Sequence, residues 1–354
     1  MSRPSRRATT GNPELDEALR HVLDLAAPTD DRDLLLDILV SATRLATDDT
    51  DRLDLKITAA ALREMRTAFR AFAPYRAVPK VTMFGSARTR HEDPLYAQAR
   101  DLAHDLASHG WMVVTGAGPG IMEAGMEGAG RASSFGVSIR LPFETNANAI
   151  ISGDPKLVSM KYFFTRKLML IKESAGFVAL PGGFGTLDET FELLTLQQTG
   201  KAVPAPIVLL DVPGGTYWHA MLHLLRSEVE TMGLISPGDL GLVRVTDDVS
   251  EATRSLLGFY RNYHSIRWVG NRLVVRLKAA PTDAEIEELN DRFGDLCAAG
   301  GCIERTAALP DEVESDDVVD LPRLVLPFDI FRTAELHRFI GGLNALPSAP
   351  PPVV

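Results

Sequence analysis

The sequence predicts an α/β protein whose main domain has a Rossmann-like, mostly parallel sheet with helices on both faces. An N-terminal helical extension precedes this domain, and a small C-terminal α+β appendage follows it. Between residues 76 and 260, apolar runs of strand length alternate with amphipathic segments of helix length. This alternation indicates right-handed βαβ units covered on both sides. Three of the apolar runs end in glycine-containing turns, which in such a sheet lie beyond the carboxyl ends of the strands, where ligands bind.

The N-terminal part of the chain has two predicted regions. Residues 1–12 are polar and basic and are expected to form a disordered tail. Residues 13–75 are expected to be a helical extension that packs on the main domain. Apolar residues at helical spacing predict its helices at 13–25, 30–46 and 53–72.

The main domain, residues 76–260, has six predicted strands. They are expected at 80–84, 111–115, 138–141, 176–180, 206–211 and 242–245. The stretch after the third strand is expected to be irregular. The predicted helices lie at 94–108, from the turn at 116–120 through 131, and at 159–174, 186–197 and 218–232.

The pattern changes after Tyr260, and residues 261–345 are expected to form an accessory α+β domain. Alternation over 266–277 predicts a strand pair that turns at Gly270-Asn271. The other predicted elements are a helix at 282–297, a strand at 324–328 and a helix at 332–340. Six acidic residues between Asp311 and Asp320 are expected to form a solvated loop, and residues 346–354 a proline-rich tail.

Composition excludes several classes of protein. The formal net charge of −10 argues against a surface for long nucleic acids, so an anionic substrate would need a local site. Two cysteines, Cys297 and Cys302, are too few for a disulfide scaffold or a four-cysteine zinc site. No apolar run has membrane-spanning length, and the arginines near the N-terminus precede no signal-type apolar region. We therefore expect a cytoplasmic protein with no membrane partner.

The most informative stretch runs from Ala179 to Glu189 and contains a glycine-rich turn between a predicted buried strand and a predicted helix. Glycines let the backbone approach a ligand closely, and N–H groups at a helix start attract an anion, here most simply a phosphate. Glu189 falls near the start of this helix. Position alone therefore favours an acid in the first helical turn, stabilised by the helix dipole.

Residues Pro181 to Glu189, PGGFGTLDE, resemble the PGGxGTxxE signature of the LOG ("lonely guy") family of nucleoside 5′-monophosphate phosphoribohydrolases, once labelled lysine decarboxylases. Arg166-Lys167 resembles the RK of the family's MHxRK motif, at the family's distance from Glu189. The resemblance covers about residues 80–260. It implies that Arg166 and Glu189 are the catalytic pair.

The resemblance and the glycine turns together predict the residues that bind the nucleotide and its phosphate. These are Gly85, Ser86, Gly116, Gly118, Gly120, Glu123, Lys167, Pro181, Gly182, Gly183, Gly185 and Thr186. Two departures stand out. Ala117 occupies a glycine position of the family's second loop, and Phe163-Phe164 replaces the family's Met-His, which changes the wall of the expected pocket.

Other readings of these motifs fit less well. In the turn at Gly116–Gly120, Ile121 stands where a dinucleotide fingerprint needs its third glycine, and Gly200-Lys201 lacks the rest of a Walker A motif. His219 and His223 are four residues apart, but Ala220 stands where a zinc protease needs glutamate. We expect no cofactor and no metal.

The predicted function is hydrolysis of the N-glycosidic bond of a purine or cytokinin-type nucleoside 5′-monophosphate, giving the free base and ribose 5-phosphate. A carboxylate such as Glu189 can stabilise the positive charge of the ribosyl centre or orient the attacking water. The alternative is a non-catalytic nucleotide sensor of the same fold, which would have no need of a carboxylate beside an anionic ligand. A lysine decarboxylase has no support, since no lysine stands in a cofactor-binding context. The resemblance also implies a homo-oligomer, a dimer or larger.

Overall fold

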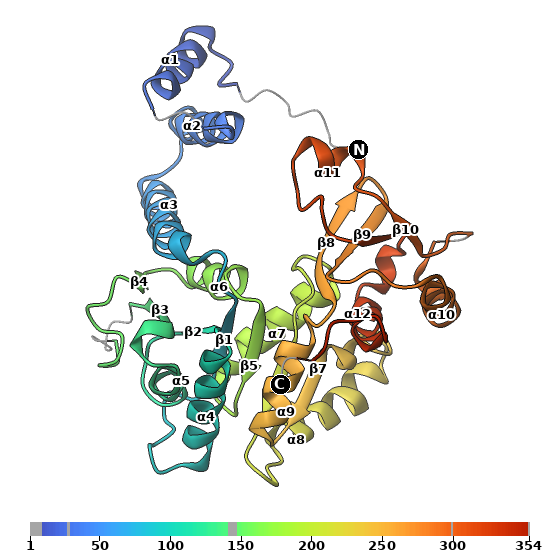
Figure 1. The fold of residues 1–354 in the computed structure, drawn as a ribbon. Helices are drawn as coiled ribbons and strands as arrows, with labels where there is room; N and C mark the ends of the chain where they lie inside the picture. The colour runs from blue at the N-terminus through green and yellow to red at the C-terminus, as the bar shows by residue number, and fades with distance from the viewer. Residues whose placement is uncertain (1–8, 27–28, 141–146, 299, 353–354) are drawn as a thin grey trace. The chain divides into compact units, whose positions relative to one another are not determined.

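The computed structural model describes residues 9–26, 29–140, 147–298 and 300–352, and it confirms the predicted α/β fold class (Figure 1). The predictions for residues 1–8 and for Leu141 lie outside the described residues. The chain divides into two compact units, Met1–Glu64 and Met65–Val354. The predicted division of the second unit into a main and an accessory domain stays a prediction.

The first unit is helical, as predicted. It contains α1 (Pro13–Asp24), α2 (Arg32–Thr47) and the first part of α3 (Arg52–Phe72), which continues into the second unit. Asn12 begins α1, because its side chain accepts hydrogen bonds from the backbone N–H groups of Glu14 and Leu15. Thr9 and Thr10 both donate to the Asp16 carboxylate, so residues 9–12 take part in this cap.

A seven-stranded sheet organises the second unit, with strand order β4-β3-β2-β1-β5-β6-β7 and every neighbouring pair parallel. Its strands are β1 Lys80–Phe84, β2 Met112–Thr115, β3 Ser134–Ile139, β4 Leu157–Met160, β5 Gly176–Ala179, β6 Ile207–Leu210 and β7 Val243–Thr246. From β1 the chain builds the sheet in one direction as far as β4, then returns to the other side of β1 with β5. The strand order therefore reverses between the neighbouring strands β1 and β5. Open α/β sheets bind ligands beyond the carboxyl ends of the strands at such a point.

Helices cover both faces of this sheet, because the central strands β1, β2, β5 and β6 bury apolar side chains on both sides. One core cluster joins the strands to α4 (Pro94–Ser108), α5 (Ile121–Ala129) and α9 (Val249–Gly258). The other joins them to α6 (Phe163–Lys172), α7 (Phe184–Gln198), α8 (Tyr217–Leu224) and the end of α3.

Two predictions around β3 and β4 are wrong. The third strand begins at Ser134, four residues before its predicted start, because a serine and a glycine interrupt the apolar pattern that marks the others. Residues 157–160 form β4, whereas a helix was predicted from Ser159 and an irregular stretch before it. As a short strand at the sheet edge, β4 has an exposed serine and lacks the continuous apolar run of a central strand.

Two helices near the end of the sheet also differ from the prediction. The helix predicted over 218–232 stops being α-helical at Leu224, and residues 225–230 continue with π-helical hydrogen bonding. Helix α9 was not predicted at all. It begins at a side-chain cap, in which Asp248 accepts from the Glu251 N–H, and its buried residues pack against α4 and β6.

A second, antiparallel sheet follows, with strand order β10-β11-β9-β8. Its strands are β8 Tyr263–Val269, β9 Arg272–Leu277, β10 Glu304–Thr306 and β11 Arg323–Leu326. The predicted strand pair is confirmed, since β8 and β9 pair across a turn in which Gly270 has a φ of +64°. Helices α10 (Asp283–Phe293) and α12 (Glu335–Ala345) share its core. Leu346 and Ala349, from the predicted proline-rich tail, are buried there too.

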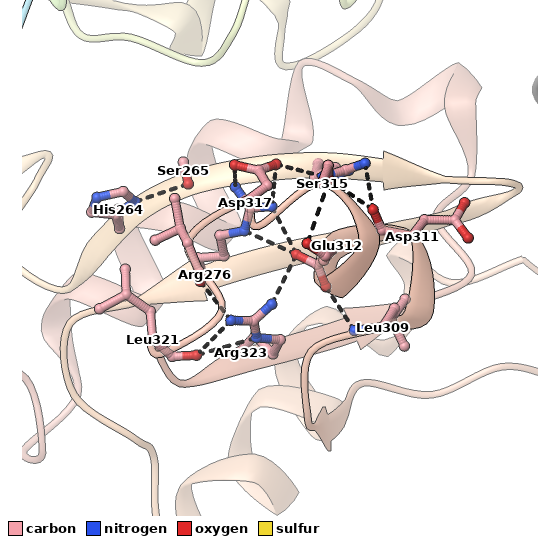
Figure 2. Close-up of polar contacts among 12 residues, drawn as sticks. His264, Ser265, Arg276, Leu309, Asp311, Glu312, Ser315, Asp317, Leu321 and Arg323 are labelled. Carbon is pink, nitrogen blue, oxygen red and sulfur yellow. Dashed lines mark hydrogen bonds and ion pairs between the residues drawn. The ribbon is translucent and has the colours of Figure 1, made fainter. Parts of the chain in front are cut away.

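The prediction that residues 311–320 form a solvated loop is wrong. Part of this stretch belongs to α11 (Pro310–Glu314), and the Glu312 side chain is fully buried. Figure 2 shows the cause: Glu312 Oε1 lies 2.7 Å from Arg276 Nη2 and 2.9 Å from Arg323 Nη1, while Asp317 pairs with Arg276 at 2.7 Å. Buried arginines on β9 and β11 require these carboxylates, because an unpaired buried charge is costly.

Candidate active site

The candidate site lies at the carboxyl ends of three adjacent strands, β2, β1 and β5, where a cavity of about 1040 Å³ opens. The turn after each strand contributes to its wall, so three loops that are far apart in the sequence meet there. Ten predicted site residues line the cavity: Gly85, Ser86, Gly116, Gly118, Arg166, Gly182, Gly183, Gly185, Thr186 and Glu189. Four others, Gly120, Glu123, Lys167 and Pro181, are not among its lining residues.

Close packing against side chains of α6 and α7 explains why two of these turns need glycine. A Cβ built on Gly116 would lie 2.2 Å from Arg166 Nη2, and one built on Gly182 would lie 2.1 Å from Thr186 Oγ1. Gly120 lies behind the cavity with a φ of +68°, and a Cβ there would approach the Ser86 carbonyl oxygen to 2.4 Å. Ala117, the departure from the family's glycine, also adopts a left-handed φ of 60°. The loop therefore keeps a glycine-like conformation there despite the added side chain.

Helix α7 begins in the glycine-rich turn, with Gly183 at the N-cap position and no side-chain cap. Because Gly183 has no side-chain oxygen to accept from the first-turn N–H groups, these groups can serve a ligand instead. Residues Gly183, Gly185 and Thr186 all line the cavity. An anion in this part of the cavity would meet both the N–H donors and the positive end of the helix dipole.

Glu189 lies in the second turn of α7, and the explanation of this residue as a first-turn acid is wrong. Helix α7 begins at Phe184, two residues before the predicted start, and no acidic residue lies in its first turn. The Glu189 side chain is buried yet borders the cavity, and its Oε2 has no hydrogen-bond partner among the described residues. Burial raises the pKa of Glu189 to about 7, although the charges of Lys167 and Arg166 oppose this rise.

Arg166 approaches the same cavity from α6. Its Nε donates a 3.1 Å hydrogen bond to the carbonyl oxygen of Val137 in β3, which anchors the guanidinium group above the sheet. A Cβ built on Gly116 would lie 2.2 Å from Arg166 Nη2, so the guanidinium group lies against the Gly116 turn, and Arg166 lines the cavity. The planar fork of an arginine suits a phosphate or ribose hydroxyl groups.

Lys167 and Glu123 do not line the cavity and form ion pairs with other side chains. Lys167 Nζ lies 2.9 Å from Asp188 Oδ2 and 2.7 Å from Glu192 Oε2, both on α7. Glu123 lies in the first turn of α5 with its Oε2 3.8 Å from His91 Nε2. Within the described part of the chain, no group of three His, Cys, Asp or Glu side chains is arranged to hold a metal ion.

Sequence reasoning did not single out two arginines of the cavity wall, Arg88 and Arg140. Arg88 follows the Gly85-Ser86 turn, and its N–H donates to the Ser86 hydroxyl at 3.1 Å. Its position two residues after Ser86, in a turn predicted to bind phosphate, is the sequence signal that could have identified Arg88. Of the two phenylalanines that replace the family's Met-His, Phe163 lines the cavity and Phe164 does not.

The helices of the described residues include none with both the length and the apolar content needed to cross a bilayer.

Known proteins match part of the chain, and the family match lies in the main domain that contains the cavity. The family model described as "Possible lysine decarboxylase" matches residues 119–256. A probable cytokinin riboside 5′-monophosphate phosphoribohydrolase of Oryza sativa is 31% identical over 170 residues, which cover 47% of this chain and 77% of the rice protein. A cytokinin riboside 5′-monophosphate phosphoribohydrolase of Mycobacterium tuberculosis is 29% identical, over 46% of this chain and 87% of its own.

Among solved structures, the molybdenum cofactor carrier protein of Chlamydomonas reinhardtii is 24% identical with a TM-score of 0.36, covering 50% of this chain and 94% of its own. The family assignment depends on the sequence relatives. Given the identity to the rice protein over most of that protein's length, the chain belongs to the LOG family.

Proposed function

We propose that this protein hydrolyses the N-glycosidic bond of a nucleoside 5′-monophosphate, releasing the free base and ribose 5-phosphate. The observation that carries the proposal is the Glu189 carboxyl group, buried at the wall of the same cavity that the start of α7 lines, where a phosphate would be held. The names of the rice and M. tuberculosis relatives support the same reaction. A purely binding protein would have no use for a buried acid beside an anionic ligand.

The residues suggest a division of labour. The N–H groups at the start of α7 and the turns after β1 and β2 hold the 5′-phosphate. Arg166 donates further hydrogen bonds to the phosphate or the ribose hydroxyl groups through its guanidinium group. The C1′–N bond then breaks with its electron pair leaving on the base, while the ionised Glu189 carboxylate stabilises the positive ribosyl centre. Water adds its oxygen to C1′, and its proton is passed on to the departing base. Fixing the phosphate orients the sugar against Glu189.

AMP or an N6-substituted AMP is expected to be hydrolysed, whereas adenosine is not, because the turns after three strands are committed to the phosphate. We expect a preference of at least about 100-fold in kcat/KM. Chromatography of reactions with AMP, N6-isopentenyl-AMP and adenosine, followed as free base and ribose 5-phosphate, measures this preference. Equal turnover of adenosine would contradict phosphate anchoring, and tight nucleotide binding without any product would favour the sensor alternative.

We also propose that the protein is a homo-oligomer that associates through α6 and α7. Both helices present apolar side chains to solvent: Phe164 and Leu168 on α6 are 55% and 44% exposed, and Phe184 and Phe191 on α7 are 94% and 38% exposed. The ion pairs of Lys167 bring these helices side by side. A second copy of the chain is the simplest partner to bury this exposed apolar surface. Phe184 also borders the cavity, so such an interface would lie beside the site.

Light scattering after gel filtration is expected to show a dimer or larger assembly for the native chain and a monomer for Phe184→Asp combined with Phe164→Asp. Charges at these positions would be buried without partners in an interface. Leu224→Asp, at an exposed apolar residue of α8, serves as the control and should keep the native mass. A native chain that is monomeric at every concentration tested refutes the interface.

A further inference from the structure

Arg166 and Lys167 are neighbours in the sequence but reach different surroundings. Successive side chains of a helix point about 100° apart, so Arg166 reaches the cavity while Lys167 turns toward α7. The Lys167 side chain is only 14% exposed, and its Nζ contacts three carboxyl groups: Asp188 at 2.9 Å, Glu192 at 2.7 Å and Glu189 at 4.0 Å. Lys167 is not among the residues that line the cavity, so its ammonium group reaches Glu189 without being part of the cavity wall.

Glu189 needs such a counter-charge more than most carboxylates do. Its Oε2 accepts no hydrogen bond from the described residues, and burial alone would favour the neutral acid. The charged groups that act on it are Arg166 and Lys167 from α6 and Asp188 and Glu192 from α7. The two cations favour ionisation and the two acids oppose it, while Arg88 and Arg140 line the cavity that Glu189 borders.

We propose that Lys167 is a positioning residue: its ammonium group joins α6 to α7 and favours the ionised form of the Glu189 carboxyl group without touching the substrate. Asp188 and Glu192 hold the ammonium in place at hydrogen-bonding distance. This inference depends on the proposed function only for its effect on turnover, because the charge state of Glu189 can be measured without any substrate.

The burial of both side chains argues against a simple surface ion pair for this lysine. An exposed pair gains little from its charges, but the side chains of Lys167 and Glu189 are 14% and 8% exposed, where screening is weak. On the same helix, Lys172 offers the contrast. Its ammonium group pairs with Glu173 at 2.7 Å, but the side chain is 51% exposed and is not part of the cavity wall. It supplies a matched control.

The test is a pH titration of the Glu189 carboxyl carbon by NMR in ¹³C-labelled protein, with the signal assigned by its loss in Glu189→Gln. In Lys167→Met the titration should move to higher pH by about one to three units, the usual effect of losing an opposite charge nearby. Lys167→Arg should keep the native midpoint. Lys172→Met should also titrate like the native protein.

A second variant guards against misfolding of Lys167→Met. Asp188 is 63% exposed, so Asp188→Asn should fold normally, and with Glu192 still 2.7 Å from the Lys167 ammonium group, removing the negative charge of Asp188 should move the Glu189 titration to lower pH. If the protein hydrolyses nucleotides, kcat at pH 7 should fall in Lys167→Met and rise again at higher pH, following the shifted Glu189 midpoint, with little change in KM. Unchanged Glu189 midpoints in Lys167→Met and Asp188→Asn would overturn the inference. Failure of the native protein to cleave any nucleotide would overturn only the proposed function.

Discussion

Replacing Glu189 by glutamine is expected to lower kcat by about 10²–10⁴-fold, the usual loss when a catalytic acid or base is removed. The amide keeps the size of the side chain but cannot carry the negative charge that stabilises a ribosyl cation. Nucleotide binding should stay within a few-fold of the native value, because the phosphate is held by the loops and the start of α7. Product formation measures the first effect and calorimetry with AMP the second.

The same residue should shape the dependence of the native activity on pH. With its pKa raised to about 7, Glu189 is protonated in weakly acidic solution and ionised above neutrality, so activity should rise with pH across this range. Glu251→Gln, on the distant helix α9, should keep both the rate and the profile. Native turnover in Glu189→Gln would show that another group performs the chemistry.

Arg166→Lys is expected to lower kcat/KM by about 10²–10³-fold, the cost of losing a well-placed donor. The guanidinium group donates to the Val137 carbonyl oxygen through Nε at 3.1 Å, and the same side chain lines the cavity. A lysine has a single ammonium group and cannot occupy both places. Steady-state kinetics with AMP measure the loss.

Gly116→Ala should reproduce much of this loss without changing any charge. The added methyl group would lie 2.2 Å from Arg166 Nη2 and must displace the side chain. Gly258→Ala, where a Cβ meets no atom within 4 Å, is the control for adding a methyl group. Arg166→Lys with native kinetics would count against the fork geometry, and a fully active Gly116→Ala would show that the guanidinium group can act from another position.

The parallel pairing of the main sheet, though not its strand order, could be predicted because its central strands are continuous apolar runs separated by helices. The strand at one edge of the main sheet, β4, could not be predicted. β4 has only four residues, one of them an exposed serine, and nothing local distinguishes it from the start of a helix. Glu312 shows another limit. An acidic stretch usually lies in solvent, and only the buried partners Arg276 and Arg323, distant in sequence, explain its burial.

Much of the candidate site could also be located from the sequence, since glycine turns at strand ends meet wherever neighbouring strands are parallel. Side-chain direction could not be predicted to the same degree. A boundary error of two residues moved Glu189 from the first to the second turn of α7, and the RK pair gave no sign that only Arg166 reaches the cavity. Arg88 lacked a motif of its own.

The burial of Glu189 and that of Glu312 make the two sheets respond to acid in opposite ways. Glu189 holds its proton in the folded chain up to a pKa of about 7, against 4.5 for an ordinary glutamate, so its contribution to stability is complete below pH 4.5 and is lost as pH rises through 7. Burial opposes the ionised form of Glu312, but hydrogen bonds from Leu309 and the two arginines together outweigh it and lower the pKa of Glu312. Its contribution is present above pH 4.5 and is lost as pH falls through the lowered value. Acid therefore relieves the main sheet of a buried charge while it removes the charge that holds α11 on the second sheet.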